Sequence, residues 1–179
     1  GPLAGDVFAA AVVFAPGTVI EGINDSKKLT AGKREKLFEE IVEKAEYFSI
    51  QRATVEEIER INILQSAMLA MKRAVEDIDC SPDIVLIDGN KTPEIDFKTQ
   101  AIVKGDGKSQ SIAAASILAK VARDKYMEEM AEIYPQYQFE KHKGYGTKLH
   151  YEMIDKFGPC EIHRLSFLKK YYERKNQLP

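Results

Sequence analysis

The chain has 179 residues, 44% of them hydrophobic and 30% charged, and a formal net charge of −2. This size suits a single globular domain over residues 1–179, and the near-neutral charge argues against a general polyanion binder without excluding a local basic patch for nucleic acid. Two cysteines exclude a disulfide framework and favour a reducing, cytoplasmic setting, and no apolar run reaches the roughly twenty residues that span a bilayer.

The first half of the chain predicts strands and helices in alternation. The expected elements are a strand at Val7 to Phe14, a helix from about Gly32 to Ala45, a strand at Tyr47 to Ala53 and an amphipathic helix at Asn62 to Ile78. Thr30 is the expected N-cap of the first helix. Thr54 followed by Glu57 resembles a capping box and predicts a short helix before the second one.

The second half continues this alternation, which predicts an α/β fold. The expected elements are strands ending at Asp88 and Lys104, a long helix from Ser109 to Tyr134 and a helix from Lys148 to Lys156. The pair His163-Arg164 and the final lysines form either a second basic strip or, as charged tails usually do, a merely solvated segment.

Two aspartates are the most informative residues. The apolar run 84–87 ends in Asp88, and the run 101–103 is followed by Asp106; each acid adjoins glycine. This pattern is typical of fully buried strands whose tips lie at a ligand crevice. Two carboxylates brought together there need a cation or a proton between them, and oxygen ligands suit Mg²⁺ or Mn²⁺. The pair predicts metal-dependent phosphoryl transfer; alternatively, each Asp only ends a strand and begins a turn.

The segment 141–147 combines cations with a tyrosine flanked by two glycines. Gly144 and Gly146 would let backbone amides approach a ligand and leave the Tyr145 ring free to stack, while Lys143 would neutralise phosphates. The alternative is a solvated glycine loop with the tyrosine packed on the core. The three histidines are too scattered in sequence to predict a histidine metal site.

These residues together resemble bacterial ribonuclease HII over nearly the whole chain. The matching blocks, in order and with their spacing kept, are Gly1 to Gly5, Asp25 to Leu29, Leu86 to Gly89, Val103 to Asp106, Ser111 to Val121, Arg123-Asp124, His142 to Thr147, and His163-Arg164 with Ser166-Phe167.

The resemblance implies a ribonuclease H-like mixed sheet flanked by helices, with a helical C-terminal part. It implies an endonuclease that cuts the RNA strand of RNA–DNA hybrids, and duplex DNA at single ribonucleotides, leaving a 5′-phosphate and a 3′-hydroxyl. Asp88 and Asp106 match two of the family's metal-binding acids, for two Mg²⁺ or Mn²⁺ ions. Tyr145 matches its ribose-sensing tyrosine, and Gly1 the last glycine of a substrate-reading Gly-Arg-Gly turn.

The chain departs from the family pattern at its start. The family has an Asp-Glu pair on its first strand, ahead of that turn, and this chain begins at the turn's last glycine, so the first strand is expected to be truncated. Without two of four ligands, this chain alone is expected to be inactive or nearly so, although the intact protein is active. Loss of a core strand would also expose unpaired backbone. Asp6 replaces a usual proline, and Gly107 a usual alanine.

The expected partners are RNA–DNA hybrids and duplex DNA containing ribonucleotides, with no membrane, and the expected state is a monomer. Lys27, Lys28 and Lys143 are expected to position the phosphate backbone, together with Gly144 beside the tyrosine. The rival hypothesis is a non-catalytic module that binds hybrids through the tyrosine loop, with structural acids. A third hypothesis, another α/β enzyme class, is disfavoured because no glycine-rich phosphate loop is present.

Overall fold

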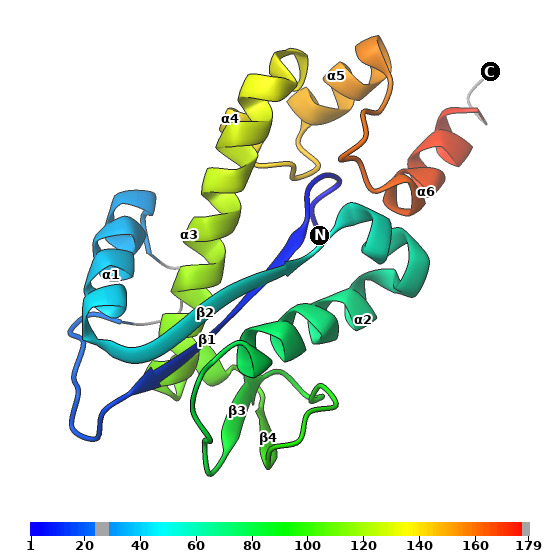
Figure 1. The fold of residues 1–179 in the computed structure, drawn as a ribbon. Helices are drawn as coiled ribbons and strands as arrows, with labels where there is room; N and C mark the ends of the chain where they lie inside the picture. The colour runs from blue at the N-terminus through cyan, green and yellow to red at the C-terminus, as the bar shows by residue number, and fades with distance from the viewer. Residues whose placement is uncertain (24–28, 177–179) are drawn as a thin grey trace. The chain divides into compact units, whose positions relative to one another are not determined.

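The computed structural model describes residues 1–23 and 29–176. Its elements, in order, are β1 (Val7–Phe14), α1 (Ala31–Lys44), β2 (Ala45–Ala53), α2 (Val55–Glu76), β3 (Val85–Asp88), β4 (Thr99–Ile102), the short 3₁₀ helix η2 (Gly105–Gly107), α3 (Gln110–Ile133), the 3₁₀ helix η3 (Pro135–Tyr137), α4 (Phe139–His142), α5 (Lys148–Phe157) and α6 (Leu165–Lys175) (Figure 1). Strands and helices alternate up to β3, β4 follows β3 directly, and only helices follow β4, which confirms the α/β fold with a helical C-terminal part. No helix among these elements is long and apolar enough to cross a membrane.

Local capping explains where two helices begin. The Thr30 hydroxyl accepts a hydrogen bond from the Lys33 N–H (3.3 Å), which confirms the predicted N-cap of α1. The capping box is also present, because the Thr54 N–H donates to the Glu57 carboxylate (2.9 Å) and the Glu57 N–H donates to the Thr54 hydroxyl (3.2 Å).

The two helices predicted after β2 abut and are continuous as α2. At their junction Asn62 has non-helical angles (φ 70°, ψ 164°), and its side-chain oxygen accepts the N–H of Gln65 (3.1 Å). Asn62 therefore caps the second helical segment, at the residue where the sequence predicted that helix to begin. A non-glycine residue in this conformation bends the chain sharply.

The Cα positions fall into two compact units. One comprises Gly1–Val7, Ala53–Ser66 and Arg123–Pro179, and the other comprises Phe8–Arg52 and Ala67–Ala122. The chain passes from one unit to the other inside β1, β2, α2 and α3. Each unit has its own hydrophobic core, and we refer to them as the terminal unit and the sheet unit.

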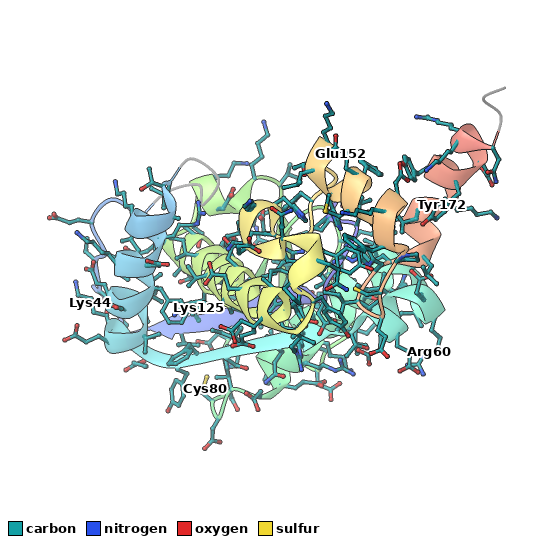
Figure 2. The ribbon with its side chains drawn as sticks, turned by 90° about the horizontal axis from the view of Figure 1, so that it is seen from above. Lys44, Arg60, Cys80, Lys125, Glu152 and Tyr172 are labelled. Carbon is teal, nitrogen blue, oxygen red and sulfur yellow. The ribbon has the colours of Figure 1, made fainter. Side chains whose placement is uncertain are left out.

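The core of the sheet unit lies between α1, the first half of α3 and the strands β1 and β2. Leu37 and Ile41 of α1 pack with Ile117 and Leu118 of α3, and all four are buried. Small side chains at the start of α3, such as the buried Ala114, allow this close packing, as the sequence predicted. Charged residues of α1 lie outside: Figure 2 labels Lys44, whose ammonium is 2.7 Å from Glu40.

The strands of the sheet unit form two small sheets. β1 pairs with β2, and β3 pairs with β4 in parallel, with Val85 opposite Thr99 and Asp88 opposite Ile102. A cavity of about 390 Å³ is lined by Phe8–Phe14 on one side and Ile84–Asp88 on another, with α2 and α3 residues completing its wall.

The prediction that the two Asp-ending strands are fully buried is wrong. In β3 only Ile87 is buried, no residue of β4 is buried, and Val103 lies beyond β4 with 57% of its surface exposed. The physical reason is the sheet arrangement: among the described residues β3 and β4 each have one strand neighbour, and β3 borders a cavity rather than packed side chains.

The terminal unit is built from helices packed around the first residues of the chain. One cluster contains Ala4, Met127, Tyr137 and Phe139, and all four are buried. A second cluster joins Leu3 to α5 and α6 through two further buried residues, Ile154 and Leu168. Polar residues of α5 face away from this core: Glu152, labelled in Figure 2, lies 3.7 Å from the Lys148 ammonium.

Candidate active site

Asp88 lies at the end of β3, beside the turn that carries Asp106. Its side chain is exposed, and one carboxylate oxygen accepts the backbone N–H of Gly105 at 2.8 Å. Asp88 is in register with Ile102, the last residue of the parallel partner β4. Because parallel strands end at the same edge of a sheet, the chain leaving β4 turns directly past the Asp88 carboxylate. The structure therefore brings Asp88 together with the Gly105-Asp106 turn.

The turn itself has an unusual backbone. Lys104 adopts left-handed angles (φ 56°, ψ 45°), and Gly105–Gly107 form the single 3₁₀ turn η2. The Ser109 N–H donates to the Gly105 carbonyl (2.8 Å), so η2 leads straight into α3. A lysine in this region costs of order 1 kcal/mol or more, and such strain is concentrated at functional sites. The sequence carried no signal of the Lys104 conformation.

Asp106 is partly exposed within η2, one turn ahead of the N-terminus of α3 at Gln110. Both acids can therefore offer oxygens to solvent, and carboxylate oxygen is the ligand type that Mg²⁺ and Mn²⁺ take in phosphoryl-transfer sites. Among residues 1–23 and 29–176, no group of three or more His, Cys, Asp or Glu residues is placed to hold a metal ion. Asp88 and Asp106 are thus two acids at one turn, without a third possible ligand beside them among the described residues.

Gly105 is required by the close approach of the Ile112 side chain to its backbone. A Cβ atom at Gly105 would lie 2.6 Å from the Ile112 Cδ1 and 3.4 Å from an Asp88 carboxylate oxygen. The contact with Asp88 would be an ordinary one, whereas the overlap with Ile112, which borders the cavity, would require that side chain or the turn to shift. At Gly107, in the same turn, a Cβ would meet nothing within 4 Å.

We expect Gly105→Ala to lower the free energy of unfolding by about 1 kcal/mol, because Ile112 must be displaced. We expect it also to weaken Mn²⁺ binding, because a turn that shifts to relieve the Ile112 contact would carry the Gly105 N–H away from the Asp88 carboxylate. Urea unfolding and metal titration measure the two effects. Gly107→Ala is the matched control and should change neither; equal effects of the two substitutions would contradict the role given to Gly105.

Tyr145 lies in the terminal unit, in the loop between α4 and α5. Its ring is 43% exposed, so it is not packed into the core. The Arg123 guanidinium lies over the ring, 5.4 Å from its centroid, as in cation–π pairs. The sequence left open whether this ring was accessible or packed on the core, and the structure leaves it accessible.

The structure gives a packing reason for a glycine at position 144. Its φ is +80°, and a Cβ there would lie 2.7 Å from the backbone oxygen of Ala4. The Leu3 N–H donates to the Gly144 carbonyl at 2.7 Å. Gly144 therefore permits close contact with the chain's own first residues.

The remaining predicted substrate-binding residues are Lys143, Gly1, Lys27 and Lys28. The Lys143 ammonium is 2.6 Å from the Glu128 carboxylate and its side chain is 21% exposed, so its charge is partly neutralised. Gly1 is exposed, with the Phe167 ring as its neighbour. Lys27 and Lys28 lie outside the described residues.

Two buried arginines hold the first residues of the chain, and sequence reasoning missed both. Arg164 is 2% exposed and donates to the Gly5 carbonyl through Nε (2.9 Å) and Nη2 (2.7 Å). Arg123 donates to the Ala4 carbonyl through Nη2 (3.0 Å). Burial lowers the Arg164 pKa to about 10, which leaves it charged at neutral pH. The prediction that His163-Arg164 belongs to a solvated or surface basic strip is wrong, because both side chains are buried.

Comparison with known proteins assigns the family. The Ribonuclease HII family profile matches residues 1–170. The chain is 59% identical over 169 residues to Ribonuclease HII of Caldicellulosiruptor bescii (94% of this chain, 82% of the relative), and 57% identical over 167 residues to Ribonuclease HII of Idiomarina loihiensis (93% and 89%). The crystal structure of ribonuclease H2 from Pyrococcus horikoshii superposes with a TM-score of 0.80 at 22% identity, covering 99% of this chain and 95% of that one. This chain therefore belongs to the ribonuclease HII family.

Proposed function

We propose that this protein is an endonuclease that hydrolyses the RNA strand of RNA–DNA hybrids and incises duplex DNA at single ribonucleotides, leaving a 5′-phosphate and a 3′-hydroxyl. Membership of the ribonuclease HII family supports a ribonuclease H nuclease activity. The structural observation that carries the proposal is the hydrogen bond between Gly105 and Asp88, which sets one acid beside the turn bearing the other. The finer points, namely the single-ribonucleotide substrate and the metal mechanism, are proposals.

Asp88 and Asp106 would hold divalent ions, Mg²⁺ or Mn²⁺. One Asp88 oxygen accepts the Gly105 N–H, and this bond orients the carboxylate while its other oxygen is available. Two bound ions supply an activated water and stabilisation of the leaving 3′-oxygen in reactions of this class. In this proposal Asp88 would be the ligand shared by the two ions, and Asp106 would be the ligand beside the attacking water.

Tyr145 would read the sugar. The residue is 43% exposed and the Arg123 guanidinium lies 5.4 Å from its ring centroid, which suits stacking on the ribose that bears the 2′-hydroxyl. Gly144 and Gly1 would lie beside the same sugar through their backbones. Lys143 would contact phosphate after leaving Glu128, and Lys27 and Lys28 would add further phosphate contacts. These roles are proposed from residue chemistry and the family match.

Cleavage of a defined duplex tests the proposal. We expect this chain alone to be inactive or nearly so, and we expect any cleavage to require Mg²⁺ or Mn²⁺ and to be confined to a DNA duplex carrying one ribonucleotide, with the all-DNA duplex of the same sequence left intact. Because the described residues place only a pair of acids at this corner, we expect slow turnover, which requires single-turnover conditions with excess protein.

Calorimetric titration of Mn²⁺ separates the proposal from its rival. A non-catalytic hybrid-binding module would bind the hybrid yet show no metal binding that depends on Asp88 and Asp106. Hybrid binding with neither cleavage nor such metal binding would favour that module. If this chain bound neither the RNA–DNA hybrid nor the ribonucleotide-containing duplex, both the nuclease hypothesis and the binding-module hypothesis would be refuted.

A further inference from the structure

Three histidines that are far apart in the sequence form one buried cluster in the terminal unit. His142, His150 and His163 are 7%, 0% and 2% exposed. The His142 and His150 rings stack with centroids 4.3 Å apart, and the His150 and His163 centroids are 5.2 Å apart. Every ring nitrogen of the three has a hydrogen-bond partner within the chain, which argues against a role in holding a metal.

The hydrogen bonds determine which nitrogen carries each proton. The Cys160 backbone N–H donates to His163 Nδ1 (2.8 Å), so the His163 proton is on Nε2 and is donated to His150 Nε2 (3.0 Å). His150 then has its proton on Nδ1 and donates it to the Tyr145 carbonyl (3.0 Å). The result is a directed relay of neutral rings from Cys160 through His163 and His150 to Tyr145.

The third histidine holds the same loop from the other side. The Gly144 N–H donates to His142 Nδ1 (3.2 Å), and His142 Nε2 donates to the Tyr137 carbonyl (2.9 Å). The Tyr145 N–H donates to the backbone carbonyl of His142 (2.9 Å). Both polar backbone groups of Tyr145 are therefore bound to residues of the cluster, while its ring stays exposed.

The surroundings keep the relay neutral. Burial lowers the pKa of His150 and of His163 to about 4, and the pKa of His142 is also lowered by burial. The Cys160 thiol, 3.2 Å from His163 Nδ1, stays protonated because burial raises its pKa to about 11. The other groups that act on the cluster are Glu140, through His142; Glu161, through Cys160; and the Tyr137 hydroxyl, whose pKa burial raises. The Phe139 ring contacts all three imidazoles from within the core.

We propose that His150 and His163 are positioning residues for Tyr145: their directed hydrogen bonds hold the tyrosine backbone so that its exposed ring meets a ribose in one orientation. The proposal rests on the proposed function, because it gives the relay a part in selecting ribonucleotides. His150 is the last member of the relay and the direct donor to Tyr145. If His150 had only a structural role, its packing in the core would matter and its hydrogen bond to Tyr145 would not.

Two substitutions at one position separate the hydrogen bond from packing. In His150→Asn, the amide nitrogen takes the place of Nδ1 and can still donate to the Tyr145 carbonyl; in His150→Leu, the side chain fills space but has no donor. Phe139→Leu removes packing against the same rings without touching the relay's hydrogen bonds, and is the control for lost stability.

The first measurement is amide hydrogen exchange at Tyr145 and Thr147, whose N–H groups are bonded within the loop. We expect His150→Leu to speed exchange there about tenfold, as for the loss of one hydrogen bond, and His150→Asn to stay within about threefold of the original chain. Phe139→Leu should lower the midpoint of urea unfolding without this local effect. Unchanged exchange in His150→Leu, or an equal increase in Phe139→Leu, overturns the proposal.

The second measurement is the ratio of affinities for a duplex with one ribonucleotide and for the all-DNA duplex, measured by fluorescence anisotropy in EDTA so that no cutting occurs. We expect this ratio to fall several-fold in His150→Leu and to recover in His150→Asn. If the ratio stays unchanged although exchange is faster, the selective role is refuted. If the unmodified chain shows no preference while the exchange results are as expected, the proposed function fails and the positioning of the loop stands.

Discussion

Asp88→Asn is expected to reduce metal-dependent cleavage by on the order of 100-fold to 1,000-fold, because loss of a metal-binding charge removes several kcal/mol of transition-state stabilisation. The substitution changes the charge alone, because the asparagine side-chain oxygen can still accept the Gly105 N–H that Asp88 accepts at 2.8 Å. The turn before α3 therefore keeps its anchor while the charge is lost. Single-turnover cleavage of the ribonucleotide-containing duplex measures the effect.

Asp96→Asn is the matched control for charge. Asp96 is exposed in the loop between β3 and β4, so its replacement changes net charge by the same amount without touching the candidate site. We expect unchanged cleavage with Asp96→Asn and unchanged hybrid affinity in EDTA with either variant. Undiminished cleavage by Asp88→Asn would remove Asp88 from the active site.

The second large effect is a loss of stability in mild acid. In the folded chain the pKa of His150 and of His163 is lowered to about 4 by burial, whereas an unfolded histidine titrates near its ordinary value of about 6.5. Between these values the unfolded state binds more protons, so the free energy of unfolding falls as pH falls. From pH 7 to pH 4.5 each ring contributes a loss of about 2 kcal/mol, and above pH 7 the curve is flat with respect to these groups.

Urea unfolding at a series of pH values measures this slope. His163→Gln is the informative variant, because its amide nitrogen can still donate to His150 but does not titrate, so the part of the loss that His163 contributes, about 2 kcal/mol, should disappear. Carboxylates such as Asp155, whose pKa is lowered by hydrogen bonds from Lys175 and Tyr171, affect stability mainly at still lower pH. A stability curve without slope between pH 6.5 and pH 4.5 would contradict the neutral relay.

The sequence was sufficient for features that depend on neighbouring residues. The N-cap at Thr30 and the capping box of Thr54 and Glu57 involve residues three apart, so the side chain that caps and the amide that it binds lie close together in the sequence. The starts of α1, α3 and α5 and the α/β order were predictable for the same reason. The family was recognisable because several short blocks keep their order and spacing, which is also a linear property.

Burial of the strands and the partners of Arg164, His150 and His163 depended on the tertiary structure. Arg164 binds the Gly5 carbonyl 159 residues away, and no local pattern identifies which distant backbone oxygen will be left for a guanidinium to bind. The histidines lie 8 and 13 residues apart, outside any helical or strand period, and only the packing of α4, α5 and the 160–164 segment brings their rings together. Hydrogen bonds within a turn follow from adjacent residues, whereas contacts across the fold exist only after apolar packing has placed their elements.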